Sequence, residues 1–277
     1  MNLDPEFTPF ETEKAIRFET FTFSGGEPHI KIISDLSEDD HVVITTRIRS
    51  FNDMGLLLIS VDALRRMGVK VIDLVLPYMP AARQDRVMVP GEPLTVKVYA
   101  DLINELNFES VTIFDPHSEV APALLNHAKV LSNHGFVKQV IEAINSDMVL
   151  VSPDGGALKK VYKVSEYLGG IEVIECSKKR NVMDGTLEGF RVYSDDLKGQ
   201  DCLVIDDICD GGGTFLGLAK ALREKNAGDL YLAVSHGIFS RGVDQLKQYY
   251  KQIFTTDAFQ SIDDDSVEVV EMKALLK

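Results

Sequence analysis

Short runs of apolar, β-branched residues alternate along the chain with longer amphipathic segments. The run at 42–46 predicts a strand, and residues 54–67 predict a helix because apolar side chains recur there at helical spacing. Gly169 and Gly170 mark the end of another helix, since glycine favours the left-handed cap. The same reasoning predicts strands at 71–76, 111–114, 148–151, 171–174, 202–205 and 230–234, and helices at 95–106, 136–144, 157–168 and 214–225.

This order of elements predicts an α/β fold with mainly parallel sheets and helices on both faces. The strands are almost continuously apolar, which is typical of strands that are covered on both sides. A length of 277 residues favours two domains. The weakest join lies at 131–135, so we expect one domain at 1–133 and a second at 134–277.

The composition is acidic, with 29 Lys and Arg against 43 Asp and Glu and a net charge of −14. Such a balance argues against a surface whose main task is to bind nucleic acid or an anionic membrane, although it allows a local basic pocket. No apolar run approaches the roughly 18 residues of a membrane span, and the acidic start is unlike a signal peptide. We therefore expect a cytoplasmic protein with reduced core thiols at Cys176, Cys202 and Cys209.

The most informative segment is 203–215, where a strand leads into two carboxylates, three glycines and the start of a helix. Glycines let backbone N–H groups converge on an anion, and Thr214 is placed to cap the helix. Asp206 and Asp207 would accept hydrogen bonds from vicinal sugar hydroxyls while the loop holds a phosphate. The alternative is an acidic, glycine-rich turn with a structural role alone.

This segment resembles the ribose-phosphate loop of the type I phosphoribosyltransferase fold, in the form used by ribose-phosphate pyrophosphokinases, also called PRPP synthetases. Further strings occur in the order of that family, and the resemblance extends from about residue 22 to residue 256. The matching strings are Pro-Tyr-Met-Pro-Ala-Ala-Arg-Gln-Asp-Arg at 77–86, Phe-Asp-Pro-His at 114–117, Ser-Pro-Asp-Gly-Gly at 152–156 and Ser-His-Gly-Ile-Phe-Ser at 235–240.

The resemblance implies two tandem type I phosphoribosyltransferase-like domains, with the ATP-binding segment in 1–133 and the ribose-phosphate and catalytic loops in 134–277. It also implies transfer of the diphosphoryl group of Mg-ATP to the anomeric hydroxyl of a ribose 5-phosphate unit, which gives PRPP and AMP. ATP is then a co-substrate and Mg²⁺ the cofactor. Members of the family assemble into homo-oligomers, so a dimer or a hexamer is expected.

The resemblance assigns a role to each matching position. Lys178 and Arg180 would stabilise the transferring group from a mobile catalytic loop, together with His117. His117 and Asp154 would bind the magnesium ion. The nucleotide would be bound by Phe23, Glu27, Arg83, Gln84 and Asp85, and the ribose phosphate by Asp206, Asp207, Asp210, Gly211, Gly212, Gly213 and Thr214.

The sequence departs from the pattern of the family in three places. Gly25 stands where an Asp is usual in the adenine-binding loop, and the apolar residues 87–89 stand where basic residues are usual. Gly211 replaces a usual Thr in the 5-phosphate loop. The lost side chain predicts room for a substituent on the phosphate, so the alternative acceptor is ADP-ribose, in a reaction of NAD salvage.

Two other classes of function remain open. A catalytically silent member of the family would act as a regulatory subunit, although the retained His117, Asp154, Lys178 and Arg180 argue against it. A phosphoribosyltransferase that consumes PRPP would share the loop at 206–214. It would have no need for the segment around Arg83, so dependence on ATP separates the two.

Overall fold

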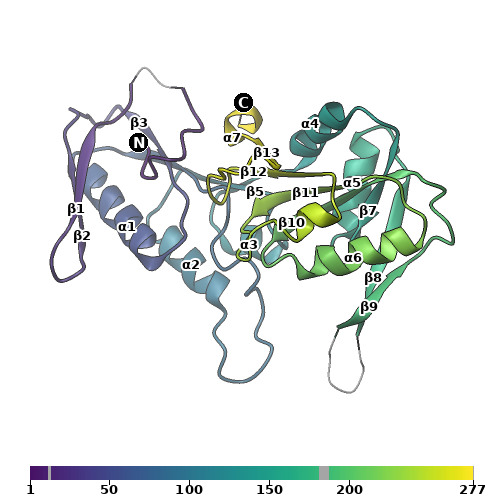
Figure 1. The fold of residues 1–277 in the computed structure, drawn as a ribbon. Coiled ribbons are helices and arrows are strands. Elements are labelled where there is room, and N and C mark those ends of the chain that lie inside the picture. The colour runs from purple at the N-terminus through teal and green to yellow at the C-terminus, as the bar shows by residue number, and fades with distance from the viewer. Residues whose placement is uncertain (12–13, 181–186, 277) are drawn as a thin grey trace. The chain divides into compact units, whose positions relative to one another are not determined.

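The structure is a computed structural model that describes residues 1–11, 14–180 and 187–276. The chain forms two compact units (Figure 1). The first unit comprises residues 1–132 with 258–261 and 272–277, and the second comprises 133–257 with 262–271. The predicted second domain runs unbroken to residue 277, whereas two short C-terminal segments pack with the first unit.

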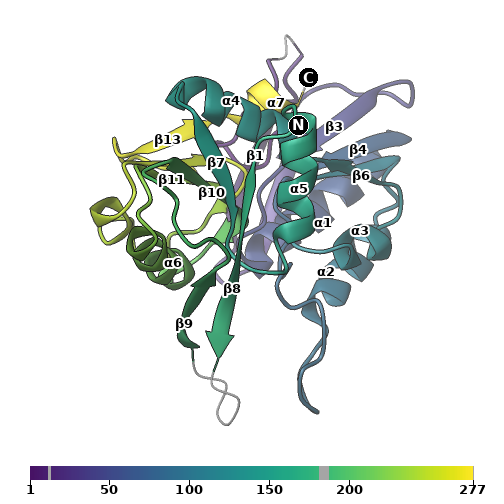
Figure 2. The ribbon, with the colours of Figure 1, turned by 90° about the vertical axis from the view of Figure 1, so that its right-hand side faces the viewer.

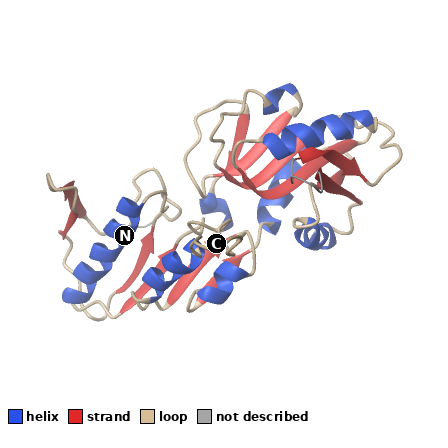
Figure 3. Cartoon of the chain, turned by 90° about the horizontal axis from the view of Figure 1, so that it is seen from below, coloured by secondary structure: helices blue, strands red, loops and turns tan. Residues whose placement is uncertain are grey.

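The first unit is built on a parallel four-stranded sheet with the strand order β3-β4-β5-β6. A separate antiparallel hairpin, β1–β2, lies against α1 and apart from this sheet (Figure 3). The elements of this unit are β1 (Phe18–Thr22), β2 (Pro28–Ile32), β3 (His41–Thr45), α1 (Phe51–Arg66), β4 (Val71–Val75), α2 (Thr95–Asn104), β5 (Ser110–Phe114), α3 (Val120–Leu124), β6 (Ala128–Leu131) and α7 (Met272–Leu275).

Helix α1 begins three residues earlier than its apolar pattern predicts, because a capping box fixes its start. The Ser50 backbone N–H donates to Asp53 Oδ2 at 2.7 Å, and the Asp53 N–H donates to Ser50 Oγ at 3.3 Å. These two bonds satisfy backbone groups that a helix N-terminus otherwise leaves without partners. Leu57, Val61 and Leu64 are buried at helical spacing, so this face of α1 packs into the core as predicted.

The second unit is built on a seven-stranded sheet with the order β13-β12-β11-β10-β7-β8-β9, parallel except for the β8–β9 pair. Helix α6 lies on one face of this sheet and α5 on the other (Figure 2). The predicted α/β fold with mainly parallel sheets is confirmed. The elements are α4 (His134–Ile144), β7 (Met148–Ser152), α5 (Leu158–Tyr167), β8 (Val173–Arg180), β9 (Leu187–Val192), β10 (Asp201–Cys209), α6 (Gly213–Glu224), β11 (Leu230–Gly237), the 3₁₀ turn η1 (Leu246–Gln248), β12 (Gln252–Thr256) and β13 (Val267–Val270).

Strands β8, β10 and β11 each extend well beyond the apolar run that predicted them. Strands β10 and β11 stay in register from Cys202 opposite Leu230 to Cys209 opposite Gly237. Backbone hydrogen bonds between neighbours do not depend on side-chain polarity, so the ladder continues through the carboxylates. Asp206 therefore lies inside the strand, which corrects the prediction that the acidic pair follows it.

Helix α6 starts without the predicted hydroxyl cap. Gly212 is the N-cap, with φ +76°, and no side chain caps the helix. Thr214 is already the second helical residue, so the prediction that its hydroxyl caps the helix is wrong. A left-handed φ of this kind carries little penalty only in glycine, which explains the residue type at this position.

The three cysteines are free and buried, as predicted for core thiols. Burial raises the pKa of Cys176, Cys202 and Cys209 to about 12 in each case, so the thiols stay protonated. In the part of the chain that the structure describes, no helix is both long and apolar enough to cross a membrane.

Gly228 offers a test of packing at the turn before β11. A Cβ on this residue would overlap the backbone oxygen of Gly199 and lie 2.7 Å from Asp201 Oδ1. We expect Gly228→Ala to lower the free energy of unfolding by about 2 kcal/mol, because the crowding atom is backbone and cannot rotate away. Urea unfolding measures the change. Gly155→Ala is the control, since a Cβ there meets nothing within 4 Å, and equal stability of the two variants would contradict this packing.

Candidate functional site

In the second unit, the predicted site residues gather where neighbouring parallel strands end. Strands β8, β7, β10 and β11 are adjacent in that order. Asp154 follows β7, Lys178 lies near the end of β8, and the acidic pair lies near the end of β10. Because the carboxyl ends of parallel strands share one edge of a sheet, residues far apart in sequence come together there.

Asp154 is held as an anion by three donors. Its Oδ2 lies 2.7 Å from Lys178 Nζ, and its Oδ1 accepts the backbone N–H groups of Gly156 at 2.9 Å and Ala157 at 3.2 Å. Burial by itself raises the pKa of Asp154, but Lys178 and the two N–H groups outweigh it and hold the pKa below its usual value. Asp154 therefore provides a fixed negative charge beside a lysine.

Lys178 lies on a strand, which corrects the prediction that it belongs to a mobile loop. It pairs with Phe190 across the antiparallel β8–β9 hairpin, in which the two strands run side by side (Figure 2). The Phe190 ring packs on α6, where a Cβ on Gly217 would lie only 2.6 Å from it. Arg180 is the last residue of β8, and the rest of the expected catalytic loop, 181–186, lies outside the described residues.

Asp206 and Asp207 form a coupled pair of acids. Burial, and then the charge of Asp207, raise the pKa of Asp206 well above its usual value, while the Asp207 N–H donates to Asp206 Oδ1 at 2.9 Å. Asp207 is buried and lies 3.5 Å from the ammonium of Lys160 on α5. Asp206 is therefore the member of the pair whose protonated form the fold favours, while Asp207 lies beside the lysine ammonium.

Lys160 was not predicted from the sequence. The sequence feature that could have pointed to it is a lysine pair, Lys159 and Lys160, at the start of the helix that follows the Asp154 turn. A helix that starts at the ligand-binding edge of a sheet presents its first turn to that edge. Only the fold shows that Lys160, and not its neighbour, pairs with Asp207.

The glycine loop after β10 is tied to the segment that follows β11. Ser240 Oγ donates to Asp210 Oδ1 at 2.6 Å, and the Ser240 N–H donates to the Asp210 carbonyl at 3.1 Å. Ile238 and Phe239 both donate to the Cys209 carbonyl, at 2.9 and 3.1 Å. The loop thus has a fixed shape, as an anion cradle requires.

Beside Gly211, an arginine side chain borders the space that was expected to be open. A Cβ built on Gly211 would lie 3.4 Å from both Cδ and Nε of Arg241 and 3.7 Å from its Cγ. The arginine side chain therefore flanks, at van der Waals distance, the room that the missing threonine side chain was expected to leave. The structure adds no support for a bulky substituent on the acceptor phosphate.

In the first unit, the predicted nucleotide segment and His117 follow adjacent strands, β4 and β5. Asp85 is buried, with a side-chain exposure of 3%, and accepts from Arg86 Nε at 2.8 Å. Arg86, with Ser118 and the nearby His117, holds the pKa of Asp85 below its usual value. Asp85 therefore links the nucleotide segment at 77–86 to the residues that follow β5, through buried contacts.

Arg83 and Gln84, the other two residues predicted to bind the nucleotide in that segment, are exposed. Gln84 Oε1 accepts the Thr95 hydroxyl at 2.5 Å, which fixes the amide near the start of α2. The Arg83 side chain is exposed beside it. A guanidinium fork suits phosphate oxygens and an amide suits the edge of a base, so both residue types fit a nucleotide.

Phe23 lies at the turn of the β1–β2 hairpin and is 53% exposed. Its ring contacts Phe21 edge-on, with centroids 4.8 Å apart, and also contacts His29. Glu27 folds back over the turn, so that a Cβ on Gly25 would lie 2.5 Å from its carboxylate. An acidic group thus already occupies the space beside Gly25, where an aspartate was expected.

Among the residues that the structure describes, no three His, Cys, Asp or Glu side chains form a cluster that could hold a metal ion. His117 lies in the first unit and Asp154 in the second. The Asp154 carboxylate is 28% exposed and supplies the hard oxygen that Mg²⁺ prefers. This donor fits a magnesium ion that arrives on substrate phosphates, which needs only one or two protein oxygens.

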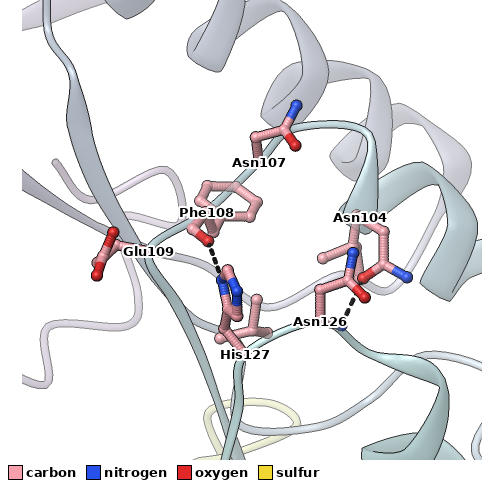
Figure 4. Close-up of a pocket in the computed structure, with 8 residues that line it drawn as sticks. Asn104, Asn107, Phe108, Glu109, Asn126 and His127 are labelled. Carbon is pink, nitrogen blue, oxygen red and sulfur yellow. Dashed lines mark hydrogen bonds between the residues drawn. The ribbon is translucent and has the colours of Figure 1, made fainter.

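A surface pocket in the first unit does not coincide with the predicted site. It lies near the start of β5 and β6, at the edge opposite the nucleotide segment, where His127 Nδ1 lies 3.0 Å from the Phe108 carbonyl (Figure 4). Its polar lining is mainly amide groups. Ligands of open α/β sheets bind at the carboxyl ends of strands, so this pocket is at the wrong edge.

Comparisons with known proteins agree with this picture. A family model described as the N-terminal domain of ribose phosphate pyrophosphokinase matches residues 12–106, and a phosphoribosyl transferase domain matches 123–274. A ribose-phosphate pyrophosphokinase of Mycoplasma genitalium is 31% identical over 228 residues, which are 80% of this chain and 68% of the relative. One of Pyrococcus abyssi is 28% identical and covers 87% of this chain and 84% of itself.

Among solved structures, the phosphoribosylpyrophosphate synthetase of Mycobacterium smegmatis aligns with a TM-score of 0.83 and 26% identity. The alignment covers 95% of this chain and 88% of the other.

The raised pKa of Asp206 predicts how the free energy of unfolding depends on pH. Because its pKa is raised in the fold, the protonated form is favoured, and stability is lost as the pH rises from its usual 3.8 through the raised pKa. Asp206→Asn removes this loss, so we expect its free energy of unfolding at pH 8 to exceed that of the unaltered protein by about 1–3 kcal/mol.

Urea titrations from pH 3.5 to pH 8 measure the difference, which should vanish at the acid end. The control is Asp195→Asn, an exposed carboxylate in the same unit, which should change little at any pH. An Asp206→Asn variant that is less stable than the unaltered protein at pH 8 would show that Asp206 is a stabilising anion instead.

Proposed function

The chain belongs to the ribose-phosphate pyrophosphokinase family, and we propose that it transfers the diphosphoryl group of Mg-ATP to the anomeric hydroxyl of ribose 5-phosphate. The products are PRPP and AMP. One observation carries the proposal at the level of residues. The acidic pair of β10, the glycine loop and the Lys178–Asp154 ion pair occupy adjacent strand ends of one sheet.

Ribose 5-phosphate binds to the second unit. Backbone N–H groups of the loop at 210–213 and the positive end of α6 hold its 5-phosphate. Asp207 accepts hydrogen bonds from the ribose hydroxyls as an anion, and the protonated Asp206 can both donate and accept. With both ends of the sugar held, the anomeric hydroxyl has a fixed position, which is the main contribution of an enzyme to a displacement of this type.

The transfer needs no covalent enzyme intermediate. The anomeric oxygen forms a bond to the β-phosphorus and loses its proton, while the bond from that phosphorus to the α,β-bridging oxygen breaks. AMP leaves with the electron pair. Negative charge accumulates on the transferring phosphoryl oxygens, and Lys178, Arg180 and His117 neutralise it.

The nucleotide is bound by Arg83 and Gln84, with Asp85 fixing their segment from within, and by Phe23 and Glu27 at the hairpin turn. Asp154 and His117 would hold the magnesium ion, which neutralises phosphate charge when bound. Because the ring of Phe23 is exposed, its predicted adenine contact fits a site completed by a second copy of the chain. We therefore propose a homo-oligomer.

The ADP-ribose alternative lacks a favouring observation. The relatives are named for ribose phosphate, and the Arg241 side chain flanks the space beside Gly211. The reaction itself separates the two acceptors. With Mg-ATP, we expect AMP release with ribose 5-phosphate and at least tenfold slower release with ADP-ribose, because Arg241 flanks the space into which a substituent on the phosphate would extend.

A coupled AMP assay measures both rates, with ATP alone as the blank. Faster release with ADP-ribose would replace the acceptor in this proposal, and no release with either acceptor would favour a regulatory subunit. PRPP consumption that does not require ATP would identify a phosphoribosyltransferase.

Removal of the strand lysine tests its catalytic role. We expect Lys178→Ala to lower kcat by about 10²–10³, the usual effect of losing one stabilising group from the transition state, with a smaller effect on KM for ribose 5-phosphate. Steady-state assays measure both constants. Lys163→Ala, which removes an exposed lysine from α5, is the control, and an equal kcat in the two variants would exclude Lys178 from catalysis.

A further inference from the structure

Arg241 follows directly on the serine that ties the glycine loop to the segment after β11. The two Ser240 bonds to Asp210 bring the backbone of residue 241 beside the loop. The side chain then runs along Gly211, with Cγ, Cδ and Nε all within 3.7 Å of the position that a Cβ on Gly211 would occupy. A Cβ on residue 211 would meet these three atoms at van der Waals distance, so Arg241 is the neighbour that a larger side chain at 211 would contact.

The backbone at Gly211 does not itself require glycine. Its φ is not positive, unlike that of Gly212, which is +76°. An L-residue is therefore sterically allowed at 211 as far as the backbone is concerned. What a side chain there would meet is the arginine, so Arg241 lines the space beside this glycine.

The guanidinium of Arg241 is available to a ligand. The residue is exposed, and its side chain makes no ion pair or hydrogen bond with the other residues that the structure describes, although the chain carries 43 acidic residues. It stands at the edge of a loop that presents backbone N–H groups and a helix N-terminus. A guanidinium offers several N–H donors in a plane, a geometry that matches phosphate oxygens.

We propose that Arg241 binds the 5-phosphate of the acceptor and acts as a lateral arm of the glycine loop. The inference rests on the proposed function and names a residue that the motifs of the chain do not include. The loop supplies neutral N–H donors, and Arg241 supplies the full positive charge that a phosphate dianion favours. Gly211 lacks the hydroxyl of the usual threonine, and the arginine from the segment after β11 supplies a donor beside the loop instead.

The proposal predicts a binding effect without a catalytic one. Arg241→Ala should raise KM for ribose 5-phosphate about tenfold to a hundredfold, the loss expected for one hydrogen bond to a charged group. The kcat and the KM for ATP should stay within about twofold, since the 5-phosphate is remote from the bonds that change. The KM of Arg241→Lys for ribose 5-phosphate should lie between those of the unaltered protein and Arg241→Ala, because lysine keeps the charge but lacks the planar guanidinium.

A second variant tests the geometry. Gly211→Val adds branched carbon without a hydroxyl in the space that the arginine uses, so it should raise the same KM by displacing Arg241. The Gly211→Val, Arg241→Ala double variant should then be no worse than Arg241→Ala alone, because the two substitutions remove one contact. Lys220→Ala on α6, whose ammonium lies over the Tyr249 ring, is the control for loss of one positive charge from the same unit.

Steady-state kinetics and calorimetric titration of ribose 5-phosphate in the absence of ATP give two independent readouts. An Arg241→Ala variant with unchanged KM and unchanged affinity overturns the inference while the activity of the unaltered protein upholds the proposed function. A fall in kcat with unchanged KM also overturns it. If the unaltered protein neither turns over nor binds ribose 5-phosphate, the proposed function fails first.

Discussion

The site depends on how one edge of a sheet distributes negative charge. Asp154, Asp206 and Asp207 lie at neighbouring strand ends, and three full charges there would repel one another and any phosphate. The fold limits this repulsion in two ways. Lysines pair with two of the acids, Lys178 with Asp154 and Lys160 with Asp207, and the raised pKa of Asp206 disfavours the third charge. The acids proposed to bind sugar hydroxyls can therefore coexist with a loop proposed to bind phosphate.

The same pairs connect the catalytic groups to the scaffold. Lys178 sits on β8, whose partner strand packs Phe190 against Gly217 of α6, the helix that begins at the glycine loop. The strand that carries Lys178 and the glycine loop proposed to bind the acceptor phosphate thus share one helix as a support. A site carried by strands and a helix keeps its geometry more closely than one carried by loops, which suits a reaction that depends on alignment.

Much of the fold was predictable because the apolar pattern reports burial directly. The α/β class followed from the alternation of elements, and the family followed from strings such as the one at 203–215, where residue type and order are restricted by the ligand. Strand ends were not predictable. Strand β10 continues through Asp206 because its backbone pairs with β11, and such pairing leaves no signal in the pattern of side chains. Lys160 and Arg241 were missed for a related reason, because each lies beside a residue that is distant in sequence. Lys160 pairs with Asp207, and the Arg241 side chain lies beside Gly211.

A protein with a net charge of −14 that handles two phosphate-bearing substrates must rely on local cations. Exposed charges more than about 8 Å apart are largely screened at physiological ionic strength, so the distant acids weaken binding little. The cations nearest the ligands decide the local potential, and the chain places Lys178 and Arg241 on either side of the acidic pair in the strand order, one on β8 and one just beyond β11. An acidic surface then favours solubility and rejects polyanions, while the strand ends still accept a small phosphate ester.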